Sequence, residues 1–204
     1  MFICYNYFQI EYKKVLDLGG YIKMVKLYGE KVTLAVMERE DCKKVWEDTE
    51  YDFNNPTEMF IIGRSSANAD SWFDDIQKQQ GNTHIRLGIF LPENTVIGDI
   101  ALQDLEPQNH SCSIGYGLTK LKYYNKGYVT DAVKTILQYG FCHLGLERVS
   151  ASTQENNIGS QRVLEKCGFI LEGRERKAKY FAGKRHDRLI YGLLRDEYFE
   201  FIKQ

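Results

Sequence analysis

The sequence lacks a long apolar run. No stretch approaches the roughly 20 apolar residues that a helix needs to cross a bilayer, so a membrane-spanning protein is not expected. Residues 1–23 are rich in tyrosine but have no basic segment ahead of an apolar core, which argues against a signal peptide. Neither sign of charge dominates, because 27 Lys and Arg face 28 Asp and Glu, for a net charge of −1. This balance argues against general binding to nucleic acid or to an anionic membrane.

The cysteines and histidines form no metal-binding or disulfide pattern. The five cysteines are scattered, odd in number and without CxxC spacing: Cys4, Cys42, Cys112, Cys142 and Cys167. The four histidines also lack metal-ligand spacing. We therefore predict no metal, and we expect reduced thiols, buried as small hydrophobic side chains, in a cytoplasmic protein.

The length and composition are those of one globular domain. A chain of 204 residues with 43% hydrophobic and 27% charged residues can bury one substantial core. A natural first strand begins after Met24, so we expect the domain to occupy residues 24–204. Residues 1–23 are then either an appended extension, ordered or disordered, or the result of a misassigned start; both readings stay open.

Residue periodicity predicts alternating strands and helices. Period-2 patterns indicate strands at 31–36, 85–89, 96–105, 112–118, 148–153, 177–181 and 188–194. Apolar residues at helical spacing indicate one helix from about residue 38 and others at 67–79, 129–144 and 157–168. This order of elements predicts a single α/β domain in which helices wrap a mixed sheet.

Two segments indicate a binding site. Residues 124–132 (YNKGYVTDA) form a loop that opens into the helix at 129–144. The first N–H groups of a helix have no partner within it, and with the positive end of the helix dipole they can bind a diphosphate. Residues 157–169 predict a short helix that Asn157 caps and Gly168 ends. The strand at 112–118 places Ser and Gly on one face, so that a ligand can approach its backbone closely.

In this order and spacing, these segments resemble the coenzyme A half of the GNAT acetyltransferase superfamily. Within it, the chain is most similar to the branch that acetylates N-terminal Ser or Ala residues of ribosomal proteins. The resemblance covers about residues 24–198, and further matching stretches are 29–34 (GEKVTL), 96–100 (VIGDI), 114–116 (IGY), 168–173 (GFILEG) and 183–187 (GKRHD). It implies a mixed α+β fold whose central sheet is mixed, mostly antiparallel and twisted, with helices on both faces and a splayed central strand pair.

The resemblance also implies a site for acetyl-CoA as co-substrate. Backbone N–H groups of the loop would hold the diphosphate, with Lys122, Asn125, Lys126, Gly127, Tyr128, Val129 and Thr130 as the binding residues. The pantetheine arm would lie along the strand at Ile114 and Tyr116 and bond to Asn157. The family loop usually has glycine where this chain has Asn125. Asparagine is the non-glycine residue that best tolerates a positive φ, so we expect Asn125 to replace that glycine.

Catalysis requires an acid for the thiolate and a base for the amine. The resemblance implies that Ser160 lies near the sulfur and protonates it, although a residue at this position can also serve only to start the helix. Glu172, Glu58 and Tyr116 are the candidate bases, and Glu172 can equally be a surface carboxylate of the final hairpin. Family members often place an acid in the penultimate strand, where this chain has Lys179.

These observations predict an acetyl-CoA-dependent N-acetyltransferase that acts directly on a primary amine. The first candidate acceptor is the N-terminal α-amine of a protein, of ribosomal-protein type. A small amine, such as a polyamine, an amino acid or an aminoglycoside, is an alternative. A non-catalytic acyl-CoA-binding module is another. We expect a monomer or a homodimer that binds neither membrane nor nucleic acid.

Overall fold

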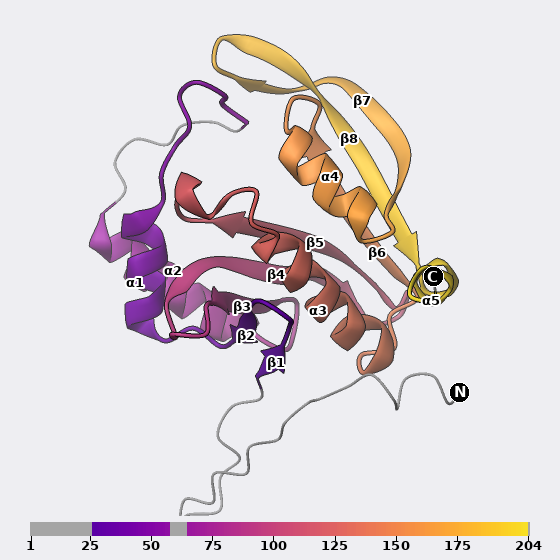
Figure 1. The fold of residues 1–204 in the computed structure, drawn as a ribbon, viewed down its shortest axis with the longest axis horizontal. Coiled ribbons are helices and arrows are strands. Elements are labelled where there is room, and N and C mark those ends of the chain that lie inside the picture. The colour runs from indigo at the N-terminus through magenta and orange to yellow at the C-terminus, as the bar shows by residue number, and fades with distance from the viewer. Residues whose placement is uncertain (1–25, 58–64, 204) are drawn as a thin grey trace, which may run out of the picture.

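One eight-stranded sheet organises the chain (Figure 1). The computed structural model describes residues 26–57 and 65–203, and the strand order is β1-β2-β3-β4-β5-β6-β8-β7. Among the strands of the described residues, only β5 and β6 pair in parallel; the other neighbours are antiparallel. The strands are β1 (Leu27–Tyr28), β2 (Thr33–Ala35), β3 (Ile85–Phe90), β4 (Val96–Glu106), β5 (Ser111–Leu118), β6 (Arg148–Gln154), β7 (Ile170–Phe181) and β8 (Lys184–Leu194). The predicted mixed, mostly antiparallel sheet is confirmed.

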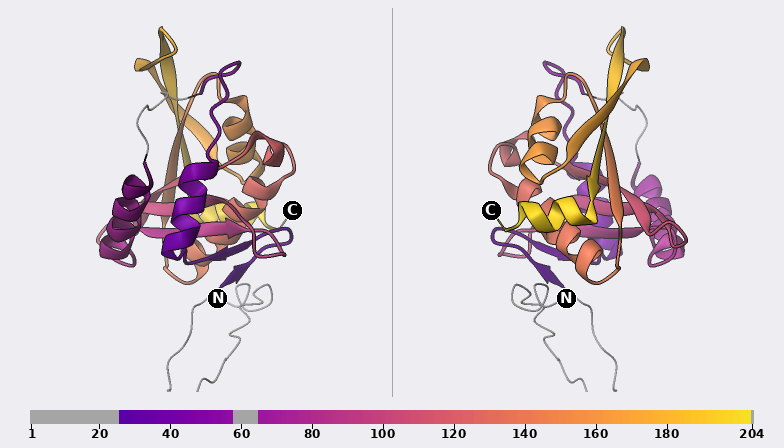
Figure 2. Two further views of the ribbon diagram at one scale, coloured as in Figure 1. Left: turned by 90° about the vertical axis from the view of Figure 1, so that its left-hand side faces the viewer. Right: turned by 90° about the vertical axis from the view of Figure 1, so that its right-hand side faces the viewer.

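Helices cover both faces of this sheet, as the resemblance implied (Figure 2). The helices α1 (Arg39–Asp48) and α2 (Ser66–Gln79) lie on one face. The helices α3 (Tyr128–Cys142) and α4 (Ile158–Lys166) lie on the other. The last helix, α5 (Arg195–Phe201), packs against α3 through stacked rings of Tyr198 and Phe141, whose centroids are 4.7 Å apart. None of the helices in the described part of the chain is long and apolar enough to span a membrane.

Two apolar clusters hold the helices to the sheet. The larger joins buried residues of β3 and β4, such as Ile89 and Ile100, to Val133 and Ile136 of α3. The smaller joins Met37 and residues of α1 and α2 to the opposite face of the sheet. Truncating a buried Leu or Ile to Ala costs about 2–5 kcal/mol of folding stability. The packing in these clusters therefore holds β4, β5 and α3 firmly together. This packing fixes where β5 ends and where α3 begins.

The C-terminal region is more regular than the sequence predicted. The strand β7 begins at Ile170 rather than at residue 177, β8 begins at Lys184 rather than at 188, and α5 was not predicted. Nearly all of β7 is exposed, and it forms an edge of the sheet. Charged residues protect such an edge from pairing with other chains, and they hide the apolar alternation on which strand prediction depends. At the other end of the domain, β2 is shorter than the predicted strand at 31–36.

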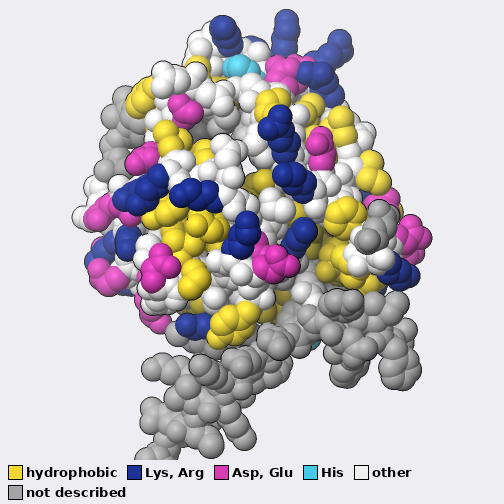
Figure 3. Space-filling model, in the orientation of Figure 1, with side chains coloured by type: hydrophobic (Ala, Val, Ile, Leu, Met, Phe, Trp, Pro, Cys, Tyr) yellow, Lys and Arg dark blue, Asp and Glu magenta, His cyan; other side chains and the backbone are white. Residues whose placement is uncertain are grey.

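The hairpin of β7 and β8 has a basic end. Its carboxylates Asp187 and Glu175 are paired with Arg174 and Arg188, and Arg174 also pairs with Glu155, which directly follows β6. Residues 176–186 contain no acid, and five exposed cations lie there: Arg176, Lys177, Lys179, Lys184 and Arg185. Figure 3 shows Lys and Arg side chains gathered where this hairpin ends, at the top of the view. The balanced net charge of the chain therefore conceals a local basic surface.

Candidate active site

The strands β5 and β6 separate in the middle of the sheet. Their parallel pairing is limited to Ser111↔Arg148, Cys112↔Val149 and Ser113↔Ser150. Beyond Ser113, β5 continues to pair with β4 as far as Leu118, whereas no strand of residues 26–57 and 65–203 pairs with its other edge. This opening is the splayed central pair that the resemblance implied.

The free edge of β5 presents its backbone to the opening. Alternate residues of a strand direct their N–H and C=O groups to opposite sides. Just after β5, Thr119 N donates to Ile97 O on the β4 side, at 2.8 Å. Ile114 and Tyr116 are an odd number of residues away from Thr119. Their backbone N–H and C=O groups therefore point to the other side, toward β6, where the strands have parted. An extended ligand can pair with them as an added strand does.

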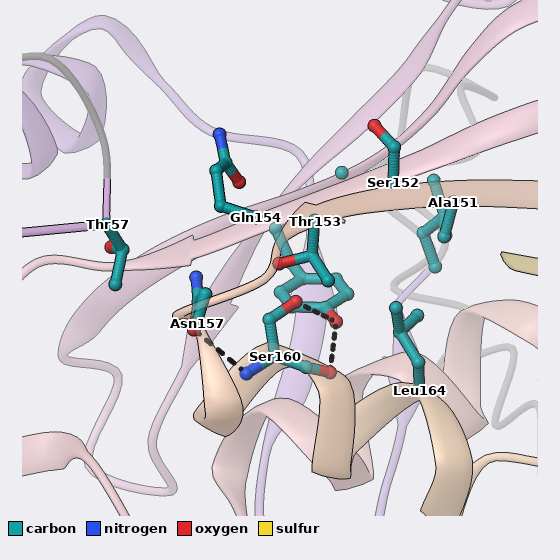
Figure 4. A pocket seen from close by; sticks show the side chains of 11 residues that line it. Thr57, Ala151, Ser152, Thr153, Gln154, Asn157, Ser160 and Leu164 are labelled. Atoms are coloured by element: carbon teal, nitrogen blue, oxygen red, sulfur yellow. Dashed lines mark hydrogen bonds between the residues drawn. The ribbon is translucent and has the colours of Figure 1, made fainter. Parts of the chain in front are cut away.

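A cavity of about 200 Å³ lies at this opening (Figure 4). Its lining comes from residues 114–116 of β5, residues 151–154 of β6, residues 157, 160 and 164 at and within α4, and Thr57. These residues supply hydroxyl, amide and aliphatic groups. No carboxylate and no imidazole is found among the described residues that line the cavity.

Tyr116 and Ser160 meet across the cavity. Tyr116 Oη lies 3.0 Å from Ser160 Oγ, and either oxygen can donate. Burial raises the pKa of Tyr116 to about 12, although its hydrogen bond to Ser160 acts in the opposite direction. Tyr116 thus stays protonated at neutral pH, so its hydroxyl can donate a hydrogen bond, and no tyrosinate is available as a base.

Asn157 caps α4, as the sequence predicted. Its Oδ1 accepts a hydrogen bond from Ser160 N at 3.0 Å, and both residues line the cavity. The cap fixes the first turn of α4 and so fixes the position of the Ser160 hydroxyl. The helix-start role and the place in the cavity are therefore compatible.

The predicted diphosphate loop has the backbone shape that the sequence indicated. Asn125 has φ 60° and Gly127 has φ 81°, so Asn125 does adopt the left-handed conformation expected of it. The first residue of α3 that donates within the helix is Asp131, whose N–H bonds Gly127 O at 3.0 Å. The N–H groups of Tyr128, Val129 and Thr130 precede that bond and lie at the positive end of the helix dipole. This arrangement fits a diphosphate.

Cationic side chains lie on the same loop. Lys122 and Lys126 are both exposed, and Lys122 Nζ lies 4.9 Å from the centroid of the Tyr123 ring. An exposed lysine can turn toward a bound phosphate without disturbing the fold. Together with the backbone N–H groups, these two residues provide a site of positive potential.

Sequence reasoning missed a link between this loop and the N-terminal turn of the domain. The carboxylate of Asp131 accepts hydrogen bonds from the backbone N–H groups of Glu30, at 3.0 Å, Lys31, at 2.8 Å, and Val32, at 3.0 Å. The sequence features that take part in this link are the acid in the first turn of α3 and the turn at residues 29–31 (GEK) before β2. Nothing in the sequence connects two segments about 100 residues apart.

Glu172 lies away from the cavity. It forms an ion pair with Arg148, at the end of β6 that still pairs with β5, and its side chain lies against Gly192. Its bond to Arg148 lowers the pKa of Glu172, which keeps the carboxylate charged. Lys179 lies beside His186 in the distal part of the hairpin. Glu58, the third predicted base, and residues 1–23 lie outside the described residues.

The described residues offer this site neither a reactive thiol nor a group of metal ligands. Burial raises the pKa values of Cys42, Cys112 and Cys167 to about 12, so these thiols are poor nucleophiles. Cys42, Cys112 and Cys167 are free thiols. Across residues 26–57 and 65–203, no group of three or more His, Cys, Asp or Glu side chains could hold a metal ion.

Comparison with known proteins identifies the fold and the family. The profile of a family described as "Acetyltransferase (GNAT) domain" matches residues 31–170. A Bacillus subtilis (strain 168) protein named "Putative ribosomal N-acetyltransferase YdaF" is 28% identical over 175 residues, which cover 83% of this chain and 94% of that protein. A solved acetyltransferase (GNAT family) from Bacillus anthracis has a TM-score of 0.69 at 25% identity and covers 84% of this chain and 99% of its own.

A third comparison concerns shape alone. A chimera of the spermidine N-acetyltransferase SpeG from Vibrio cholerae and hSSAT has a TM-score of 0.71 at 18% identity, with 83% of this chain and 99% of that chain covered. The family profile spans well over half of the sequence. The chain therefore belongs to the GNAT acetyltransferases.

Proposed function

We propose that this acetyltransferase moves an acetyl group from acetyl-CoA to the N-terminal α-amine of a protein. The observation that carries the proposal is the chemistry of the cavity, whose described lining offers hydroxyl and amide groups but no acid. At pH 7 an α-amine of pKa about 7.8 is roughly one-tenth neutral, whereas a lysine-type amine of pKa about 10.4 is neutral less than about one part in a thousand. A site without a strong base suits the first acceptor better.

The surroundings of the cavity also disfavour a polycationic acceptor. Gln154, at the edge of the cavity, is the register partner of Arg188 in β8. From there the hairpin continues into its basic end, at residues 176–186. A polyamine would meet like charge at this side of the opening, whereas a peptide with one terminal amine would not.

The coenzyme would supply the thioester carbonyl that the amine attacks. Ser160 would protonate the departing thiolate, and Tyr116 would support it. When Tyr116 Oη donates to Ser160 Oγ, the hydroxyl proton of Ser160 is left to point elsewhere in the cavity. Tyr116 therefore acts as a proton donor behind Ser160, rather than as the base. The raised pKa keeps the Tyr116 hydroxyl protonated at neutral pH. The proton that the amine gives up on becoming an amide balances the one passed to the thiolate.

Two comparisons bear on the acceptor. The relative named as a ribosomal N-acetyltransferase matches this chain over most of both lengths, which supports a protein acceptor. The likeness in shape to a spermidine N-acetyltransferase shows that this fold can serve a small-amine acceptor, which stays the second candidate function. At 18% identity this second likeness carries the fold and not the specificity.

A competition assay read by mass spectrometry tests the proposal. One reaction contains acetyl-CoA, peptides with free N-terminal Ser, Ala or Met, an N-blocked lysine peptide, and spermidine. We expect acetylation of a peptide α-amine, with no transfer to the blocked lysine peptide. Acetylation of spermidine alone would replace the proposal with the second candidate. Coenzyme binding without any acetylated product from this panel would count against an α-amine acceptor.

A further inference from the structure

The turn between β1 and β2 is fastened to the first turn of α3. Three consecutive backbone N–H groups, those of residues 30–32, donate to the single carboxylate of Asp131. The fit is tight at Gly29, where a Cβ atom would lie 2.4 Å from Asp131 Oδ2 and 2.7 Å from Thr135 Oγ1. A side chain at this position would therefore displace the Asp131 carboxylate, so the glycine lets the turn lie directly against the helix.

Lys31 projects from this turn onto the predicted diphosphate loop. Its Nζ donates to Lys126 O at 3.0 Å. It also lies beside Gly127, because a Cβ atom built on Gly127 would be 3.0 Å from Lys31 Nζ. An ammonium group has three N–H donors, so the bond to Lys126 leaves two for another acceptor. The Lys31 side chain is exposed, and it can adjust to a ligand.

We propose that Lys31 is a coenzyme-binding residue whose ammonium group donates to the diphosphate of coenzyme A, and that Asp131 is the residue that positions it. The inference rests on the proposed function, because it takes coenzyme A as the ligand of this loop. It adds a cation from the N-terminal turn to a site otherwise built from residues 122–130.

The arrangement resolves a conflict of charge. An acid in the first turn of α3 would repel a diphosphate bound at the same helix end. Here the Asp131 carboxylate is turned to the β1–β2 side, where three N–H dipoles offset its charge. The same three bonds bring the Lys31 backbone next to α3. The Asp131 carboxylate thus has its own charge offset by hydrogen bonds, and the same bonds hold the Lys31 ammonium group beside Gly127.

Calorimetric titration with coenzyme A tests the role of Lys31. We expect Lys31→Met to weaken binding about five- to tenfold, the size of one charge-assisted hydrogen bond at an exposed site. Lys31→Arg, which keeps the charge, should restore most of the affinity. The affinity of Lys31→Met should also depend less on salt than that of the unaltered protein, because one exposed attraction has been removed. Lys44→Met, the same change on α1, is the matched control and should bind normally.

Two further measurements locate the effect. The penalty of Lys31→Met should persist with 3′-dephospho-coenzyme A, which keeps the diphosphate; loss of the penalty would overturn the assignment to the diphosphate. In an Asp131→Asn background, Lys31→Met should cost less than it does alone, because the turn no longer holds residue 31 in place. Equal penalties in both backgrounds would overturn the positioning role of Asp131.

The outcomes separate this inference from the proposed function. If the unaltered protein binds coenzyme A and Lys31→Met binds within about twofold of it at low salt, the role of Lys31 is wrong while the coenzyme site stands. An equal loss of affinity in Lys44→Met would mean that the effect comes from the net charge of the protein, and it would also overturn the inference. If the unaltered protein binds no coenzyme A, the proposed function itself fails.

Discussion

Tyr116 Oη lies 3.0 Å from Ser160 Oγ and 3.4 Å from Ser160 O, so one tyrosine hydroxyl links the middle of β5 to the first turn of α4 across the opening in the sheet. The cap from Asn157 Oδ1 to Ser160 N holds the second of these residues in place. The two hydroxyl groups form a short chain inside the cavity, with a tyrosine whose pKa is raised to about 12 at its inner end. Under the proposed function this pair of hydroxyl groups would deliver a proton, and the first two predictions test that role.

Removal of the Ser160 hydroxyl should slow turnover without abolishing coenzyme binding. A positioned general acid contributes roughly 10²–10⁴-fold to a rate. We expect Ser160→Ala to lower kcat by about tenfold or more, because Tyr116 can partly take over. Its dissociation constant for coenzyme A should change by less than about threefold. Steady-state kinetics and calorimetry on the same preparation give both numbers.

The conservative variant and the double variant complete that test. Ser160→Thr keeps a hydroxyl and should retain more activity than Ser160→Ala. Because the two groups act as one chain, Ser160→Ala with Tyr116→Phe should cost less than the product of the single effects. An unchanged kcat in Ser160→Ala would remove Ser160 from the reaction.

The pH dependence of the rate should have an acid limb and no alkaline limb below about pH 10. The acid limb follows the acceptor, because an α-amine of pKa about 7.8 becomes neutral as pH rises through that value. Tyr116 has a raised pKa of about 12, so it keeps its proton, and its capacity to donate, throughout this range. The profile of kcat/KM between pH 6 and pH 10 with a free-N-terminus peptide checks this. A fall in rate near pH 9 would point to a different acid.

Much of the fold could be predicted because its signals are local. The helix α3 has an apolar face of regular period, and Asn157 is a cap that can be recognised from its neighbours alone. The positive φ of Asn125 follows from the intrinsic tolerance of asparagine. In each case the residues that decide the structure are within a few positions of one another.

The rest depends on contacts between distant residues, which a single sequence does not disclose. The bonds from Asp131 to residues 30–32 span about 100 positions. The pairing of Glu172 with Arg148 spans 24 positions and takes a predicted base away from the cavity. The helix α5 begins directly after β8, and its first turn is fixed by a bond from Leu194 N to the Glu197 carboxylate at 2.8 Å. No apolar period marks that short helix.

Replacement of Gly127 should weaken coenzyme binding. Gly127 has φ 81°, a conformation that costs a residue with a Cβ about 1–2 kcal/mol, and its Cβ would also meet Lys31 Nζ at 3.0 Å. We expect Gly127→Ala to raise the dissociation constant of coenzyme A at least about tenfold. Gly183→Ala is the matched control, because Gly183 has φ 74° with open space around it and lies in the β7–β8 turn. Equal affinity in both variants would contradict the placement of the diphosphate.

Loss of the Glu172 carboxylate should affect stability slightly and catalysis not at all. Both partners of the Glu172–Arg148 pair are about one-third exposed, with side-chain exposures of 38% and 36%, so solvent screening limits the pair to about 1 kcal/mol or less. We expect Glu172→Gln to lower the free energy of unfolding by up to that amount at pH 7, and to leave kcat within about twofold. Glu93→Gln, at an exposed turn before β4, is the control for loss of one negative charge.

The stability difference should depend on pH in one direction. The bond to Arg148 lowers the pKa of Glu172 in the folded protein below that of an unfolded glutamate, about 4.3. The contribution of the pair is therefore complete above about pH 4.3, and it is lost as pH falls through the lower folded value. Urea unfolding of Glu172→Gln and of the unaltered protein should thus differ at pH 7 and converge toward pH 3. A gap that stays constant over this range would mean that the pair is not the source of the difference. A loss of kcat of about 100-fold would return Glu172 to the role of base, because a positioned base contributes at least that much.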